Sequence, residues 1–150
     1  MVNGEGGAVF SVFNDLKLCD ESIDKVISRV VGFSGPGFAY VVTPNIDHFS
    51  RLDVPPNDIF RIAYSNADLR ICDSRIVKLL SVFESVRIKN VVPGSDLTEK
   101  ILVSSWARSV KILIVGPERD DVDFIGRKYL LNNVDSYTPP MGFIRSEIEV

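Results

Sequence analysis

Polar side chains that can bind a ligand or accept a proton follow apolar runs at three points of the sequence. Thr43 and Asn45 follow the first run, Asp73 follows the second, and Gly116 follows the third. A hydroxyl and an amide both donate and accept hydrogen bonds, which suits a nucleotide's ribose and base or a sugar's hydroxyls. A carboxylate at such a place is suited to act as a general base. Asp47, just beyond the first run, is a further binding candidate.

These positions also have plain structural interpretations. The tripeptide at residues 43–45 (TPN) is typical of a turn, because Pro ends strands and Asn can bond to its own backbone. Asp73 is equally suited to cap the helix predicted after it. On chemistry alone, both interpretations of each position remain open.

A helix N-terminus is predicted at Gly94, Ser95 and Asp96, with Asp96 as the cap and Glu99 completing a capping box. The first N–H groups of a helix can receive a phosphate, so these three residues join the substrate-binding candidates. His48 is the only histidine and has no partner at metal-binding spacing. No metal site is therefore predicted.

The elements that must position these residues alternate along the chain. Short apolar runs predict strands at residues 10–13, 38–42, 67–72 and 111–117. The second is of the kind buried on both faces, and the fourth is the clearest buried strand. Helical spacing predicts helices over residues 20–31, 46–52, 59–63, 74–83, 97–106 and 120–131. The alternation predicts an α/β fold with an open, mostly parallel Rossmann-like sheet and helices on both faces. Ligands bind such sheets beyond the carboxyl ends of the strands, where the candidates lie.

Composition limits the class of protein. The 150 residues, 45% of them hydrophobic, have room for one globular domain, predicted as residues 10–150 behind a flexible Gly-rich lead-in at residues 1–9. A net charge of -3 argues against nucleic acid as a partner. The two cysteines are far apart, so neither a disulfide nor a zinc site is predicted and a reducing compartment fits.

Several functional classes are not supported by any motif. The N-terminus lacks a secretory signal, and Gly and Pro interrupt the longest uncharged stretch, so neither export nor a transmembrane helix is predicted. The sequence also has no G-x-S-x-G, P-loop or G-x-G-x-x-G motif. The simplest hydrolase, nucleoside triphosphatase and dinucleotide-binding hypotheses are therefore dropped.

Three segments carry most of the candidate residues, namely 41–48 (VVTPNIDH), 67–73 (ADLRICD) and 92–97 (VPGSDL). In their order and spacing they resemble the WecG/TagA/CpsF glycosyltransferases. Weaker agreement continues through residues 111–116 and 139–143, so the resemblance extends over residues 10–150.

The resemblance implies inverting transfer of a sugar in bacterial cell-surface polysaccharide biosynthesis. The donor would be a UDP-sugar, N-acetylmannosamine-like or a related hexose, and the acceptor a polyprenyl-diphosphate-linked sugar. Asp73 would be the general base on the acceptor hydroxyl, with Thr43 and Asn45 in the donor site. Inversion in one displacement needs such a base and stabilisation of the departing UDP. The resemblance also implies no resident cofactor and a cytoplasmic enzyme, peripheral at the inner membrane.

Departures from the family's pattern keep a second hypothesis open. The family usually has Asp-Gly where this chain has Asp73-Ser74, and an arginine, suited to diphosphate, where it has Val91. We also expect the family's usual C-terminal segment, with Gly-x-Pro-x-Gln-Glu, to be absent from this chain. The alternative is a non-catalytic or partner-dependent sugar-nucleotide-binding module with the same fold. An unrelated nucleotide-binding regulator of the same architecture is the third hypothesis.

Overall fold

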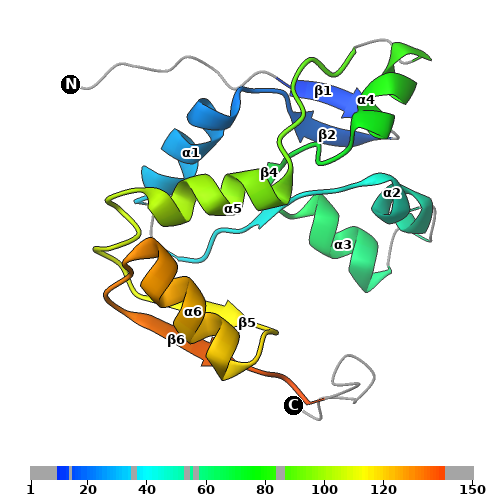
Figure 1. Ribbon diagram of the computed structural model, residues 1–150. Coiled ribbons are helices and arrows are strands. Elements are labelled where there is room, and N and C mark those ends of the chain that lie inside the picture. Colours follow the sequence, from blue (N-terminus) through cyan, green and yellow to red (C-terminus); the bar gives the residue numbers. More distant parts are fainter. Residues whose placement is uncertain are drawn as a thin grey trace. The chain divides into compact units, whose positions relative to one another are not determined.

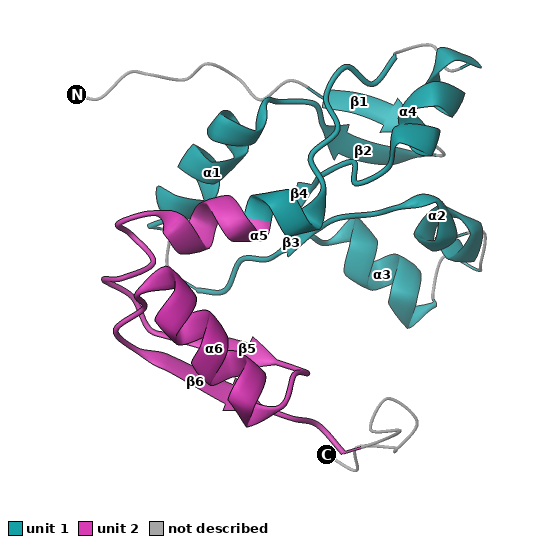
Figure 2. Ribbon diagram, in the orientation of Figure 1, with its two compact units in different colours: residues 1–97 teal, residues 98–150 magenta. Residues whose placement is uncertain are grey.

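The structure is a computed structural model that describes residues 10–13, 15–34, 37–52, 55, 58–83 and 87–140. The chain divides into two compact units, residues 1–97 and residues 98–150 (Figure 2). The predicted lead-in at residues 1–9 lies outside the described residues, and so do residues 141–143 of the resemblance. A single domain over residues 10–150 stays a prediction.

The first unit contains one antiparallel and one parallel pair of strands (Figure 1). These strands are β1 (Phe10–Phe13), β2 (Leu16–Cys19), β3 (Val41–Val42) and β4 (Leu69–Arg70). β1 and β2 form a hairpin, whereas β3 and β4 run in parallel. A parallel bridge between Cys19 and Ile71 places the end of β2 beside the end of β4. The two pairs are thereby joined within one unit.

Helices surround these strands at the positions that apolar spacing predicted. They are α1 (Ile23–Val31), α2 (Ile46–Leu52), α3 (Ile59–Ser65), α4 (Arg75–Leu80), the 3-10 turn η1 (Ser81–Phe83) and α5 (Gly94–Val103). Asp58 caps α3 by accepting a hydrogen bond from the N–H of Phe60 at 2.8 Å. α5 begins in the first unit and ends in the second.

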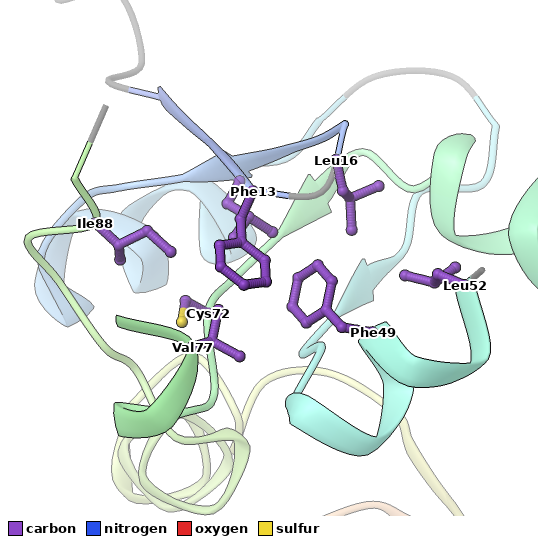
Figure 3. Packing of buried hydrophobic residues seen from close by; sticks show 8 residues of the cluster. Phe13, Leu16, Phe49, Leu52, Cys72, Val77 and Ile88 are labelled. Atoms are coloured by element: carbon purple, nitrogen blue, oxygen red, sulfur yellow. The ribbon is translucent and has the colours of Figure 1, made fainter. Parts of the chain in front are cut away.

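The core of the first unit is an apolar cluster drawn from the hairpin, α2, α4 and the segments beside them (Figure 3). Its buried members are Phe13, Leu16, Leu18, Phe49, Leu52, Cys72, Val77 and Ile88. The rings of Phe13 and Phe49 meet edge to face, with centroids 4.9 Å apart. Cys72 and Val77 anchor the chain on both sides of Asp73, so packing fixes the backbone that carries this carboxylate.

The second unit contains a β-α-β arrangement made of β5 (Ile112–Val115), α6 (Arg119–Tyr129) and β6 (Val134–Tyr137). β5 and β6 pair in parallel (Figure 2). A strand, a helix and a parallel strand in this order are typical of α/β proteins. None of the described helices is long and apolar enough to cross a membrane.

The predicted fold class is confirmed in part. The protein is a mixed α/β structure with parallel pairing, but each sheet in the described part has two strands, so one continuous Rossmann-like sheet is not shown. The prediction of a buried strand over residues 38–42 was wrong, because the strand β3 is only Val41–Val42 and Phe38 is 86% exposed. The prediction of a buried strand at β5 was also wrong, since Leu113 and Val115 are more than half exposed.

Candidate functional site

Backbone hydrogen bonds bring three of the predicted site segments side by side in the first unit. The N–H of Asp73 donates to the carbonyl of Pro44 at 3.1 Å, which joins its segment to that of Thr43. On the other side, the N–H of Val92 donates to the carbonyl of Cys72 at 2.9 Å. The segment ending in Asp73 therefore lies between the segment of Thr43 and the segment that leads into α5.

Gly94, the first residue of α5, lies where Thr43 and Asp73 come together. A Cβ atom built on Gly94 would stand 3.1 Å from Oγ1 of Thr43 and 3.6 Å from Oδ2 of Asp73. All three residues are partly exposed. A hydroxyl, a carboxylate and a helix N-terminus therefore face one small space that solvent reaches, and a side chain at position 94 would occupy part of it.

The helix after Asp73 is capped by Ser74 and not by Asp73. Ser74 has an extended backbone (φ -140°, ψ 121°), and its hydroxyl oxygen accepts a hydrogen bond from the N–H of Val77 at 3.3 Å. The alternative interpretation of Asp73 as the helix cap is therefore wrong. Its carboxylate lies toward Gly94 instead.

Asn45 and His48 form a reciprocal pair of hydrogen bonds at the start of α2. Oδ1 of Asn45 accepts from the N–H of His48 at 3.1 Å, and Nδ1 of His48 accepts from the N–H of Asn45 at 3.2 Å. This pair works like a capping box in which histidine replaces Glu or Gln. Because the Asn45 oxygen serves the helix, the amide nitrogen is the group that a ligand can use.

The other candidates of the first unit lie in the first turns of helices. Asp47 is exposed in the first turn of α2, and Ser95 and Asp96 are exposed in the first turn of α5. The hydroxyl of Ser95 donates to Oδ1 of Asp96 at 3.2 Å. The prediction of Asp96 as the helix cap was wrong, because α5 begins two residues earlier, at Gly94. A carboxylate within a first turn still interacts favourably with the helix dipole.

Gly116 belongs to the second unit and follows β5. Its N–H donates to the carbonyl of Tyr137 at 3.0 Å, and its φ is +117°, which side-chain-bearing residues rarely adopt. Backbone conformation therefore accounts for a glycine at this position. Its role in substrate binding stays a prediction.

Asp20, which sequence reasoning did not select, anchors the segment that leads into α5. This residue is 4% exposed, and its carboxylate accepts hydrogen bonds from the N–H groups of Lys89 and Asn90 and from the hydroxyl of Ser11. Burial raises the pKa of Asp20, but these hydrogen bonds outweigh burial and hold it below its ordinary value. An acidic residue directly after β2 was the available signal, but β2 itself was not predicted.

The residues that flank the site contribute apolar packing. Val91, where the family usually has arginine, is partly buried and packs against the core cluster. Burial raises the pKa of the Cys72 thiol beside Asp73. The thiol therefore stays protonated at neutral pH, and a protonated buried thiol is a poor nucleophile.

A cavity of about 460 Å³ lies elsewhere in the first unit. Its lining includes Arg29 on α1, Phe33 just after α1, and Tyr40 and Asp68 directly before β3 and β4. None of the predicted site residues lines it. Ligands of parallel sheets bind at the carboxyl ends of the strands, so we place the candidate site at Asp73 and not in this cavity.

Comparison with known proteins bears on this site. The profile of the glycosyl transferase WecG/TagA/CpsF family matches residues 11–136. The match includes every residue predicted for the site and confirms the resemblance inferred from the three segments. No curated protein matches the chain.

Proposed function

This chain belongs to the glycosyl transferase WecG/TagA/CpsF family, and from that premise we propose that it transfers a sugar from a UDP-sugar to a polyprenyl-diphosphate-linked acceptor with inversion. The family's glycosyltransferases work in cell-surface polysaccharide biosynthesis. We propose N-acetylmannosamine or a related hexose as the donor sugar, and the cytoplasmic face of the inner membrane as the place of reaction. We also propose that the fold is of the open, mostly parallel Rossmann-like kind.

In the proposed reaction Asp73 is the catalytic base. Its carboxylate takes the proton from the acceptor hydroxyl while the hydroxyl oxygen attacks the anomeric carbon of the donor. The bond between that carbon and the UDP oxygen breaks, UDP leaves with the electron pair, and the configuration inverts. A partly exposed carboxylate that does not cap α4 is suited to this proton transfer.

The donor side of the proposed site is formed by Thr43, Asn45 and the start of α5. The Thr43 hydroxyl and the Asn45 amide are suited to the sugar or the nucleoside. The N-terminus of α5, beginning at Gly94, is suited to the diphosphate, because its N–H groups and the helix dipole favour negative charge. The absence of a side chain at Gly94 leaves room for the ligand beside Thr43 and Asp73.

One observation carries the proposal: Thr43, Asp73 and Gly94, which are 30 and 21 positions apart in sequence, meet around one partly exposed space. Each residue alone has a structural explanation, as a turn, a strand end or a helix start. A hydroxyl, a carboxylate and a helix N-terminus gathered around one space are instead the groups that a nucleotide-sugar transfer needs.

The test is transfer from a panel of UDP-sugars to a short-chain lipid-diphosphate-linked sugar. We expect Asp73→Asn to lower kcat by about 10²- to 10⁴-fold, the usual contribution of a general base, with little change in UDP affinity by calorimetry. Asp120→Asn, an exposed aspartate in the first turn of α6, is the matched control and should change neither quantity. An Asp73→Asn enzyme as active as wild type would refute the catalytic role.

Val91 favours the alternative, a sugar-nucleotide-binding module that does not catalyse alone or needs a partner chain. Its side chain packs on the core and brings no cation to the diphosphate. UDP binding without turnover by the isolated chain would support this alternative. Turnover by the isolated chain, lost in Asp73→Asn, would reject it.

A further inference from the structure

The helix that follows Asp73 exposes an apolar face. Ile76, Leu79, Leu80 and Phe83 are 56%, 68%, 39% and 88% exposed. Their spacing of three, one and three residues places them on one side of α4 and η1. Val77, between Ile76 and Lys78, is instead buried in the core cluster. We call the four exposed residues the α4 stripe.

The segment that contains the α4 stripe has a net charge opposite in sign to that of the whole chain. Residues 74–90 carry four cationic side chains and one acidic side chain, a local charge of +3 in a chain of net charge -3. The cations are Arg75, Lys78, Arg87 and Lys89, and all four residues are exposed. Residues 75–83, which form α4 and η1, contain no acidic residue.

We propose that the α4 stripe docks the protein on an anionic lipid bilayer, with the four side chains in the interface and the cations at the headgroups. An exposed apolar helix face in a segment rich in Lys and Arg is typical of helices that lie in a membrane surface. A second copy of the chain fits less well, because it would bring the same cations together. The inference rests on the proposed function in one respect, since a lipid-linked acceptor places the reaction at a membrane.

The α4 stripe lies on the helix that directly follows Asp73, so docking would bring the proposed base close to the bilayer. Ser74, the cap of α4, follows Asp73 directly, so the proposed base lies at the start of the helix that would rest on the bilayer. A polyprenyl-linked acceptor reaches the enzyme from that surface. Docking through α4 would thus present the acceptor hydroxyl to the end of the molecule that holds the carboxylate.

Flotation of the full chain with vesicles tests the docking without any enzyme assay. We expect binding to vesicles of phosphatidylcholine and phosphatidylglycerol, weakened by salt, and much weaker binding to phosphatidylcholine alone. Leu79→Gln with Phe83→Gln should weaken binding at least roughly tenfold, because each exchange removes a large apolar side chain from the interface. Ile59→Gln on α3, where Ile59 is 82% exposed, is the matched control and should bind like wild type.

The charges are tested in the same assay. Arg75→Gln and Arg87→Gln should each weaken binding about fivefold, as expected for one cation at an anionic surface, while Lys25→Gln on α1 should have no effect. Circular dichroism checks that the variants fold, which exposed positions should permit. Equal binding to both vesicle types, or binding unaltered by the stripe variant, would overturn the proposal. A dimer that the stripe variant dissociates, without vesicle binding, would show that the partner is a second copy.

Failure of the docking and failure of the proposed function give different results. The stripe variant should keep wild-type transfer to a short-chain acceptor in solution and lose transfer to a long-chain acceptor embedded in anionic vesicles. Wild-type protein that floats with anionic vesicles but transfers no sugar to either acceptor would reject the function and keep the docking. Transfer to both acceptors by the stripe variant would reject the docking and keep the function.

Discussion

At the scale of single residues, Asn45 has a structural role that is compatible with the binding role proposed for it. Its oxygen accepts from the N–H of His48, and the imidazole of His48 accepts from the N–H of Asn45 in return. The helix therefore fixes the orientation of the amide. A polar side chain held in this way needs no reorganisation when a ligand arrives, which favours binding.

Asn45→Asp separates the two roles. The carboxylate can still accept from the N–H of His48, so we expect the free energy of unfolding in urea to change by less than about 0.5 kcal/mol. The amide donor is lost, so UDP affinity measured by calorimetry should fall about tenfold or more. Asn45→Ala, which loses the cap as well, should destabilise the protein by about 1 kcal/mol. UDP affinity equal to wild type in Asn45→Asp would remove Asn45 from the donor site.

At the scale of elements, α4 shows what a departure from the family's sequence does. The family usually has glycine after the aspartate, and Ser74 here adopts an extended conformation that does not require glycine. Its hydroxyl instead holds the first turn of α4 through the N–H of Val77. Ser74, and not Asp73, therefore caps α4.

Substitution of Ser74 tests whether this residue caps α4 without a part in catalysis. Alanine removes the cap and should lower the free energy of unfolding by about 1 kcal/mol, whereas glycine, the family's usual residue, should lower it by only a few tenths. Urea denaturation measures both. We expect transfer activity to survive in both variants, because Asp73 keeps its backbone hydrogen bond to Pro44. A larger loss in the glycine variant than in the alanine variant would contradict the capping role.

Local patterns in the sequence predicted the helices well and the strands less well. The bounds of α2 and the start of α3 were predicted correctly because both depend on neighbouring residues. β2 and β6 were missed, since Leu16–Cys19 and Val134–Tyr137 are short and carry polar residues. Short strands depend on pairing with distant segments, and a single sequence does not display that pairing.

The residues of the candidate site were also predicted from local sequence patterns. The residue that was missed, Asp20, depends on contacts with distant segments. Thr43, Asp73 and Gly94 stand out because each follows an apolar run or begins a helix. The structural role of Asp20 could not be predicted from the sequence, because its hydrogen-bond donors Lys89 and Asn90 are 69 and 70 positions away. A buried carboxylate is recognised from its partners, and these partners are known only from the fold.

At the scale of the whole molecule, two carboxylates make the stability depend on pH. Hydrogen bonds lower the pKa of Asp20 despite its burial, and a hydrogen bond from Arg29 lowers the pKa of Glu21. Both side chains therefore bind protons less readily in the folded chain than in the unfolded chain. Their stabilisation is complete above the ordinary carboxylate pKa of about 4 and is lost as the pH falls through their lower folded values.

We therefore expect the free energy of unfolding to decrease as the pH falls below about 5. Urea denaturation at a series of pH values measures this slope. Asp20→Asn should flatten the slope and lower stability at neutral pH by about 2 kcal/mol, because the neutral amide is a weaker acceptor for buried N–H groups. Asp120→Asn is the control on an exposed carboxylate. An identical slope in wild type and Asp20→Asn would contradict this account.

The hydrogen bonds of Asp20 also bear on when the chain can fold during its synthesis. Lys89 lies 69 positions after Asp20, so a nascent chain that ends before Lys89 leaves this carboxylate without its backbone donors. Burying a charge without partners is strongly unfavourable, and closing a long loop to reach them has its own entropic cost. We expect the hairpin to remain unburied around Asp20 until the ribosome has delivered the segment that leads into Gly94. The buried carboxylate thereby couples completion of the core to arrival of the last part of the candidate site.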